Sequence, residues 1–205
     1  LANITSYVTK MALSYPNIKF NLTNNDKKLL STDGSGNLLK VINSVYGLEV
    51  TKKMIKVSAE NSDYEISGYI SYPEINRSSR GFITLFVNGR YGRNNSGIKT
   101  ILEAYHTYLP IGRYPVVVLN IETDPSIIDV NVHPTKMDIK FSKQEELKEL
   151  LLKTLSDALL KLVLVPEIKS EEKVISNINE ITTIDKNLDF KEKTIISPKY
   201  EEISF

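Results

Sequence analysis

Phe82-Ile83-Thr84-Leu85-Phe86-Val87 is apolar at every position except Thr84. Such a short apolar run is typical of a central strand that is covered on both faces. A second run of this kind extends from Pro115 to Ile121. Between the two runs, Ser96 can cap a helix that Pro110 ends. Residues 82–121 therefore predict a strand-helix-strand unit. Asn88-Gly89 could form a tight hairpin, but the helical pattern that follows favours direct passage into the helix.

The rest of the chain alternates between helical and extended patterns. Apolar residues at spacings of three and four predict a helix up to Tyr15, a second helix from Leu38 with Gly47 as its C-terminal cap, and a long helix after the capping box Ser142-Lys143-Gln144-Glu145. Two-residue alternation predicts a hairpin around Asn24-Asn25-Asp26 and strands over residues 54–59 and 64–72. Residues 76–81 read as a basic, flexible loop.

The stretch from Asp129 to Phe141 contains an unusual polar row. Ile128, Val130 and Val132 alternate with Asp129, Asn131 and His133, so a strand here would bury one face and place the polar side chains on the other. Pro134 then interrupts the strand, and Lys136 follows at a break between two extended segments. From pattern alone, this is an edge strand, a proline turn and a solvated lysine.

Composition narrows the class of protein. The chain has 205 residues, of which 41% are hydrophobic, a net charge of +1, no cysteine and two histidines. These values predict a globular domain without disulfides and leave little for a thiolate or histidine-rich metal site. No apolar run is long enough to span a membrane and no signal segment opens the chain, so a cytoplasmic location is expected. The chain begins at Leu1 in what reads as the middle of a helix, which suggests an excised fragment.

Residues 166–205 differ in composition from the preceding part. They lack glycine, and single isoleucines are spaced among charged residues. Low hydrophobic clustering of this kind predicts a mobile linker, with a docking segment as the alternative. The sequence therefore divides into a folded domain, residues 1–165, and a linker, residues 166–205.

Several motifs together resemble the MutL family of DNA mismatch-repair ATPases. They are Asp129-Val130-Asn131-Val132-His133-Pro134-Thr135-Lys136, Phe86-Val87-Asn88-Gly89-Arg90, residues 66–71 and residues 105–115. The resemblance is of the Gram-positive, bacterial type and covers residues 1 to about 165. It implies the transducer domain of the N-terminal half, an α+β two-layer sandwich similar to domain 2 of a ribosomal protein. It also implies a left-handed strand-helix-strand crossover, against the general right-handed rule.

The resemblance also implies a division of labour between domains. In this family, related to the gyrase B subunit (the GHKL superfamily), a preceding domain holds ATP, magnesium and the catalytic glutamate. That domain is not in this sequence, so we expect neither ATP hydrolysis nor a bound cofactor from the chain alone. The implied partners are the preceding ATP-binding domain, DNA bound without sequence preference, a MutS-type mismatch recognition protein and a second copy in a homodimer.

Lys136 is the residue that the resemblance places at the nucleotide. The matching lysine of the family contacts the γ-phosphate of ATP held by the preceding domain, and a flexible ammonium suits a group that is lost on hydrolysis. Asp129, Asn131, His133, Pro134 and Thr135 are expected to support this loop through hydrogen bonds to the backbone. No catalytic residue and no metal ligand is assigned.

Arg77, Arg80, Arg90 and Arg93 are the candidate DNA contacts. They are expected to cluster at loop ends around the central strand, and the family binds DNA along a basic groove that the transducers help to form. The alternative without a DNA-binding role is that these arginines form a solvated basic rim. Two other functions stay open: a free-standing nucleic-acid-binding module of the same fold, and a hydrolase that uses His133 with Asp129, although no nucleophile motif supports the latter.

Overall fold

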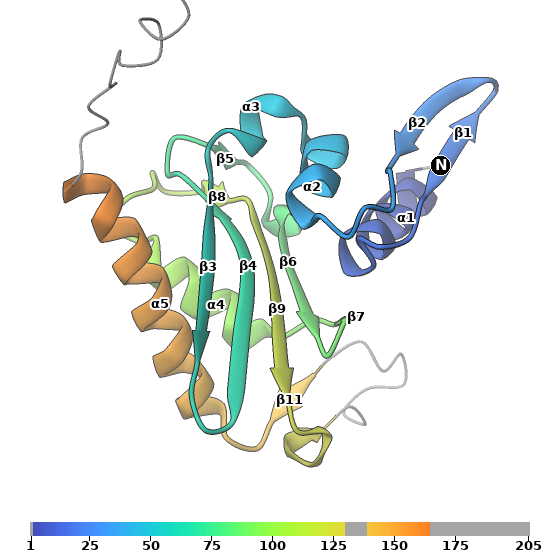
Figure 1. Cartoon of the computed structure of the whole chain (residues 1–205). Coiled ribbons are helices and arrows are strands. Elements are labelled where there is room, and N and C mark those ends of the chain that lie inside the picture. Colours follow the sequence, from blue (N-terminus) through green and yellow to red (C-terminus); the bar gives the residue numbers. More distant parts are fainter. Residues whose placement is uncertain (1, 130–138, 165–205) are drawn as a thin grey trace, which may run out of the picture. The chain divides into compact units, whose positions relative to one another are not determined.

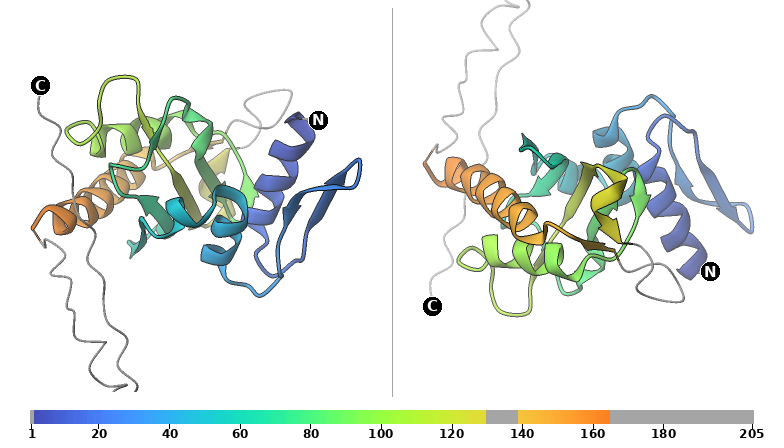
Figure 2. Two further views of the ribbon diagram at one scale, coloured as in Figure 1. Left: turned by 90° about the horizontal axis from the view of Figure 1, so that it is seen from above. Right: turned by 90° about the horizontal axis from the view of Figure 1, so that it is seen from below.

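The computed structural model describes residues 2–129 and 139–164. The linker predicted for residues 166–205 lies outside the described residues. The described residues belong to one compact unit, whose arrangement is shown in Figures 1 and 2.

A five-stranded mixed sheet forms the centre of this unit (Figure 1). Its order is β3 (Met54–Glu60), β4 (Tyr64–Ser71), β9 (Val117–Thr123), β6 (Ile83–Val87) and β7 (Arg90–Tyr91). Only β6 and β9 are parallel, with Leu85 opposite Leu119. All five residues of β6 are buried, as the apolar run predicts for a strand covered on both faces.

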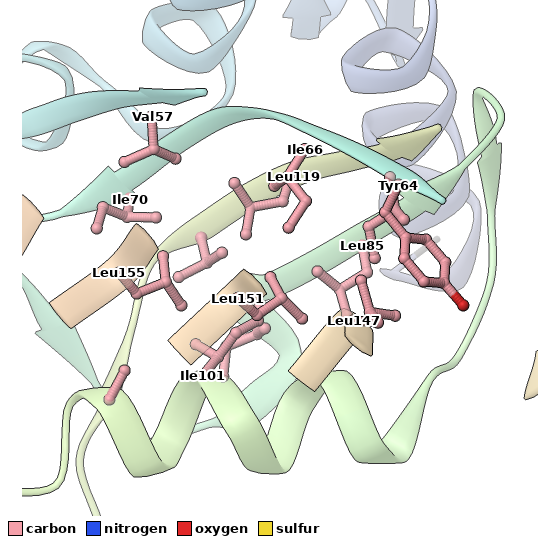
Figure 3. Packing of buried hydrophobic residues seen from close by; sticks show 14 of the residues in the cluster. Val57, Tyr64, Ile66, Ile70, Leu85, Ile101, Leu119, Leu147, Leu151 and Leu155 are labelled. Atoms are coloured by element: carbon pink, nitrogen blue, oxygen red, sulfur yellow. The ribbon is translucent and has the colours of Figure 1, made fainter. Parts of the chain in front are cut away.

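Two helices, α4 (Asn95–Ala104) and α5 (Gln144–Leu164), cover one face of the sheet. Leu147, Leu151 and Leu155 of α5 recur every four residues and are at most 2% exposed, so one stripe of the helix packs against the strands and Ile101 of α4 (Figure 3). Each of these leucines contributes on the order of 2 kcal/mol of hydrophobic burial.

The connection from β6 through α4 to β9 is left-handed. In Figure 1 both strands run downward, β9 lies to the left of β6, and α4 lies behind the sheet. The α+β fold class is therefore confirmed, and the crossover has the hand that the resemblance implied rather than the hand of most such connections.

The N-terminal elements pack on the opposite face of β6 and β9, so the helical layer is not the only cover of the sheet (Figure 2). They are α1 (Ala2–Ser14), β1 (Asn21–Asn24), β2 (Lys27–Ser31) and α2 (Leu38–Tyr46), and the short helix α3 (Leu48–Thr51) follows α2 directly. Phe86 and Val118 point to this side and join Ala12, Leu13 and Ile42 in a second core. The first two helices and the first hairpin agree with their predicted positions.

Gly68 explains how β4 and β9 pair so closely. Its φ is +146°, and a Cβ at this position would collide with the backbone oxygen of Val118. Because only glycine tolerates both conditions, the ladder between Tyr64–Ile70 and Val117–Thr123 depends on it.

Three sequence predictions around β6 are wrong: the passage at Asn88-Gly89, the N-terminal cap of the following helix and the end of that helix. Asn88 and Gly89 have φ values of 48° and 75° and form a two-residue turn that joins β6 to β7, so a tight hairpin precedes the helix. The helix itself is capped by Asn94 rather than Ser96, and it ends at Ala104, well before Pro110.

Residues 76–81 are also more ordered than the predicted loop. β5 (Asn76–Arg77) pairs with β8 (Tyr114–Pro115), and a 3-10 turn, η1, follows at Arg80–Phe82. A second such turn, η2 (Pro125–Ile127), leads to β10 (Ile128–Asp129), which pairs with β11 (Lys140–Phe141). The basic segment at 76–81 is therefore held by pairing with a distant strand.

Candidate functional site

Most of the predicted nucleotide-sensing stretch lies outside the described residues. This applies to Asn131, His133, Pro134, Thr135 and Lys136, whose roles stay predictions. Asp129 is described and is exposed at the end of β10. The structure thus defines the two ends of the stretch, at Asp129 and Ile139.

The antiparallel pair β10–β11 holds these two ends together. Ile128 lies opposite Phe141, and Asp129 lies opposite Lys140. Phe141 is 5% exposed, and its ring packs edge-on against Tyr64, with ring centroids 5.6 Å apart. Burial of this ring fixes β11 against the main core, so the ladder that flanks residues 130–138 has a rigid base.

Asn94 fixes the second end from the direction of α4. Its Nδ2 donates to the backbone oxygen of Ile139 at 2.9 Å, and its Oδ1 accepts the backbone N–H of Gly97. The backbone N–H of Ile139 in turn donates to the oxygen of Arg93 at 2.9 Å. Asn94 is 2% exposed, so one buried side chain caps α4 and also clamps the residue that follows the stretch containing Lys136.

Sequence reasoning missed Asn94. The signal that could have found it is its residue type, because asparagine is as good an N-cap as serine and stands two positions before Ser96. Its contact with Ile139 has no local signal, since the two residues meet only through the fold.

The turn that carries Arg90 is held rigidly to β9. The side chain of Asn88 donates to the oxygen of Thr123 and accepts from its N–H, both at 2.9 Å. The N–H of Gly89 donates to Oδ1 of Asn120 at 3.2 Å, and its oxygen accepts from the hydroxyl of Ser14 on α1. The position of Arg90 is therefore tied to both the sheet and the N-terminal helix.

The four candidate DNA-contacting arginines do not form one cluster. Arg77 and Arg80 lie on β5 and η1, just before β6 begins, whereas Arg90 and Arg93 follow its end. Figure 1 shows β5 and β7 toward opposite ends of the sheet. Arg80, Arg90 and Arg93 are exposed, and Arg77 is half-buried. The four arginines thus lie at loop ends around the central strand, in two pairs at its opposite ends, and their role in DNA binding stays a prediction.

Residues 2–129 and 139–164 give no support for a metal site or for a membrane-spanning helix. Within these ranges no group of three or more histidine and acidic side chains could hold a metal ion. None of the helices described there is long and apolar enough to cross a membrane.

Comparisons with known proteins agree with this geometry. Residues 42–160 match the family described as "DNA mismatch repair protein, C-terminal domain". The structure of the chain is similar to the crystal structure of the N-terminal domain of a DNA repair protein, with a TM-score of 0.66 and 28% sequence identity over 78% of this chain and 53% of that one.

Curated relatives extend the match to almost the whole sequence. The DNA mismatch repair protein MutL of Listeria monocytogenes serovar 1/2a is 45% identical over 88% of this chain and 30% of its own length. MutL of Anoxybacillus flavithermus is 43% identical over 99% of this chain and 33% of its own length. The chain thus spans about a third of the length of these relatives. Since the family match extends over more than half of the sequence, the chain belongs to the MutL family of DNA mismatch repair proteins.

Proposed function

We propose that the chain is the transducer module of a MutL-type mismatch repair ATPase. In this proposal a preceding domain of the same protein binds ATP and magnesium, and Lys136 reaches the γ-phosphate from the transducer side. Loss of that phosphate on hydrolysis removes the contact, so the nucleotide state is coupled to the closure of a homodimer. A MutS-type protein is the partner that the pathway implies.

The observation that carries the proposal is the double anchoring of the stretch that contains Lys136. The β10–β11 pair joins its two ends, and Asn94 holds Ile139 by a buried hydrogen bond of 2.9 Å. A lysine that senses the γ-phosphate requires an anchored loop. A contact of about 1.5–3 kcal/mol can change the arrangement of two domains only when the loop that carries the lysine is held firmly by its own domain. A contact of this size shifts the two-domain equilibrium by about 10- to 100-fold.

The test is ATP turnover by the N-terminal half of the protein that joins the ATP-binding domain to this chain. Lys136→Ala is expected to lower kcat by about 10- to 100-fold, because the contact that it removes is made to the reacting phosphate. Lys56→Ala is the matched control, since Lys56 is an exposed lysine on β3 at the edge of the sheet. Equal turnover by the wild type and Lys136→Ala would refute the sensor role.

We also propose that Arg90 and Arg93 contact the DNA backbone. Support comes from their exposure and from the fixed turn at Asn88-Gly89, which presents Arg90 without a loop to order. Arg90→Glu and Arg93→Glu are each expected to weaken binding of a DNA duplex and to reduce the salt dependence of binding by about one ion per arginine. Lys28→Glu, on the distant β1–β2 hairpin, reverses the same charge and should have a smaller effect. Unchanged affinity in both arginine variants would exclude this surface.

A further inference from the structure

A cavity with a volume of about 530 Å³ lies between the N-terminal elements and the beginning of β6. Its wall is built by α1, β2, α2, η1 and β6. The volume falls within the range of about 300–1,000 Å³ that is usual for small-molecule sites. We name it the α1–β6 cavity and define it by six of the residues that line it: Thr5, Thr9, Lys10, Tyr46, Phe82 and Thr84.

Two aromatic rings line the part of the cavity next to the start of β6. The ring centroids of Tyr46 and Phe82 are 5.8 Å apart, and the ring planes are inclined by 49°. The side chain of Tyr46 is also hydrogen-bonded to Thr84, which is 2% exposed on β6. Because these contacts hold the rings in place, a planar aromatic group can pack against them without first ordering a loop.

Lys10 places a positive charge toward the other end of β6. Its Nζ lies 4.0 Å from the ring centroid of Tyr91, which pairs with Phe86, four residues along the chain from Phe82. Lys10 is half-buried, and within residues 2–129 and 139–164 no carboxylate lies at ion-pair distance from it. A lysine that is partly withdrawn from water is usually paired, so an anion that reaches this ammonium is bound favourably.

Uncharged hydroxyl groups complete the polar part of the wall. Thr5, Ser6 and Thr9 line the cavity from the same face of α1 as Lys10, as their spacings of one, three and four predict. No aspartate or glutamate is among the described residues that line the cavity. The wall therefore offers hydrogen-bond donors and acceptors beside the ammonium and repels no anion.

We propose that the α1–β6 cavity binds a small molecule in which a planar aromatic ring is joined to an anionic group. The ring packs against Tyr46 and Phe82, and the anionic group accepts a hydrogen bond from Lys10. Aromatic carboxylates and nucleoside monophosphates share this chemistry. The site does not rest on the proposed function, because neither Lys136 nor the candidate DNA contacts Arg90 and Arg93 enter into it.

A titration of the 205-residue chain, followed in a ¹H–¹⁵N NMR spectrum, tests the proposal. The probes are 2-naphthoate and adenosine 5′-monophosphate. At least one of them is expected to shift the backbone amide signals of Gly81, Phe82 and Thr84 saturably, with a Kd on the order of 1 mM or lower. The probe that saturates these shifts at the lower concentration shows which of the two ligand classes the cavity takes.

A neutral probe measures the contribution of the charge. 2-Naphthylmethanol has the same ring system as 2-naphthoate without the carboxylate, so it is expected to bind about tenfold more weakly. Lys10→Gln should weaken 2-naphthoate by about the same factor and leave 2-naphthylmethanol unchanged. Lys10→Arg keeps the positive charge and should restore most of the binding of 2-naphthoate.

A variant that fills the cavity tests its location. Thr5→Phe places a ring in the cavity and should abolish the shifts of Phe82 and Thr84 with every probe. Asn3→Phe is the matched control, since Asn3 is an exposed residue of α1 outside the lining, and it should bind the probes like the wild type. If Thr5→Phe does not fold, the comparison of the two naphthyl probes on Lys10→Gln decides the question.

Three results would overturn the inference. The first is the absence of saturable shifts at Gly81, Phe82 and Thr84 with both anionic probes up to about 10 mM. The second is binding that persists unchanged in Thr5→Phe, which would place the ligand elsewhere. The third is equal affinity of the wild type for 2-naphthoate and 2-naphthylmethanol, which would remove the anionic group from the ligand class. None of these results bears on the proposed function, because ATP and DNA take no part in the titration.

Discussion

At the scale of single residues, Asn94 joins parts of the chain that are 45 residues apart. Asn94→Ala leaves the oxygen of Ile139 and the N–H of Gly97 without their side-chain partners in a buried position. We expect the free energy of unfolding to fall by about 2–3 kcal/mol, which combines a lost cap with an unsatisfied buried group. Urea denaturation followed by circular dichroism measures this change.

Its neighbour supplies the control. Asn95 is exposed and has the same side chain, so Asn95→Ala should change the free energy of unfolding by less than about 0.5 kcal/mol. Asn94→Asp keeps the cap but places a carboxylate oxygen against the oxygen of Ile139, and should therefore also destabilise. Equal stability of Asn94→Ala and Asn95→Ala would contradict the clamp.

At the scale of secondary-structure elements, the β3–β4 turn is tied to the start of α5 by a polar cluster. Nζ of Lys143 lies 2.5 Å from Oδ1 of Asp63, and the hydroxyl of Tyr64 donates to the oxygen of Lys143 at 2.9 Å. The hydrogen bond from Lys143 holds the pKa of Asp63 below its usual 3.8. Burial raises the pKa of Tyr64 to about 12. At neutral pH Asp63 is therefore ionised, Lys143 is protonated and Tyr64 is neutral, so the turn and the helix are linked at this pH.

The depressed pKa of Asp63 gives a pH-dependent stability. The carboxylate contributes fully above pH 3.8, and its contribution is lost as the pH falls from there through the lower pKa of the folded state. Asp63→Asn should therefore lose less stability than the wild type between about pH 5 and about pH 2. Lys143→Gln should flatten the same region because it removes the partner. Denaturation curves at several pH values test this, and parallel pH profiles for all three proteins would exclude the link.

Some secondary-structure elements can be predicted from local sequence patterns, and others cannot. The periodicity of α1, α2 and α5 and the apolar run of β6 are local properties, so their positions could be predicted. The pairing of β5 with β8 could not, because each has two residues and the partners are far apart in the chain. Asn88-Gly89 is a typical hairpin signal, but the helical pattern that follows it in the sequence favours direct passage into a helix.

At the scale of the whole described unit, the sheet separates two cores of unequal size. The core on the α4–α5 side has 19 buried residues and the core on the α1–α2 side has seven. Alternate residues of β6 and β9 serve both cores, for example Leu85 on one side and Phe86 on the other. The sequence predicts arginines 77, 80, 90 and 93 as candidate DNA contacts, but their division between the two ends of β6 follows only from this arrangement.

Unequal cores predict unequal local stability. Backbone amides of α2 should exchange with deuterium through local opening, whereas those of β9 should exchange only with global unfolding, because more buried contacts hold β9. Native-state hydrogen exchange at increasing denaturant measures both. Exchange of α2 and β9 with the same free energy and the same denaturant dependence would show that the two cores unfold together.

The position of β9 between β4 and β6 has a consequence for synthesis on the ribosome. β4 ends at Ser71 and β6 at Val87, but the strand that pairs with both is complete only at Thr123. Until then the nascent chain carries two strands whose inner edges lack a partner, and such edges favour pairing between different chains. The late arrival of β9 makes the interval between the synthesis of residues 87 and 123 the period in which this domain is most prone to aggregate.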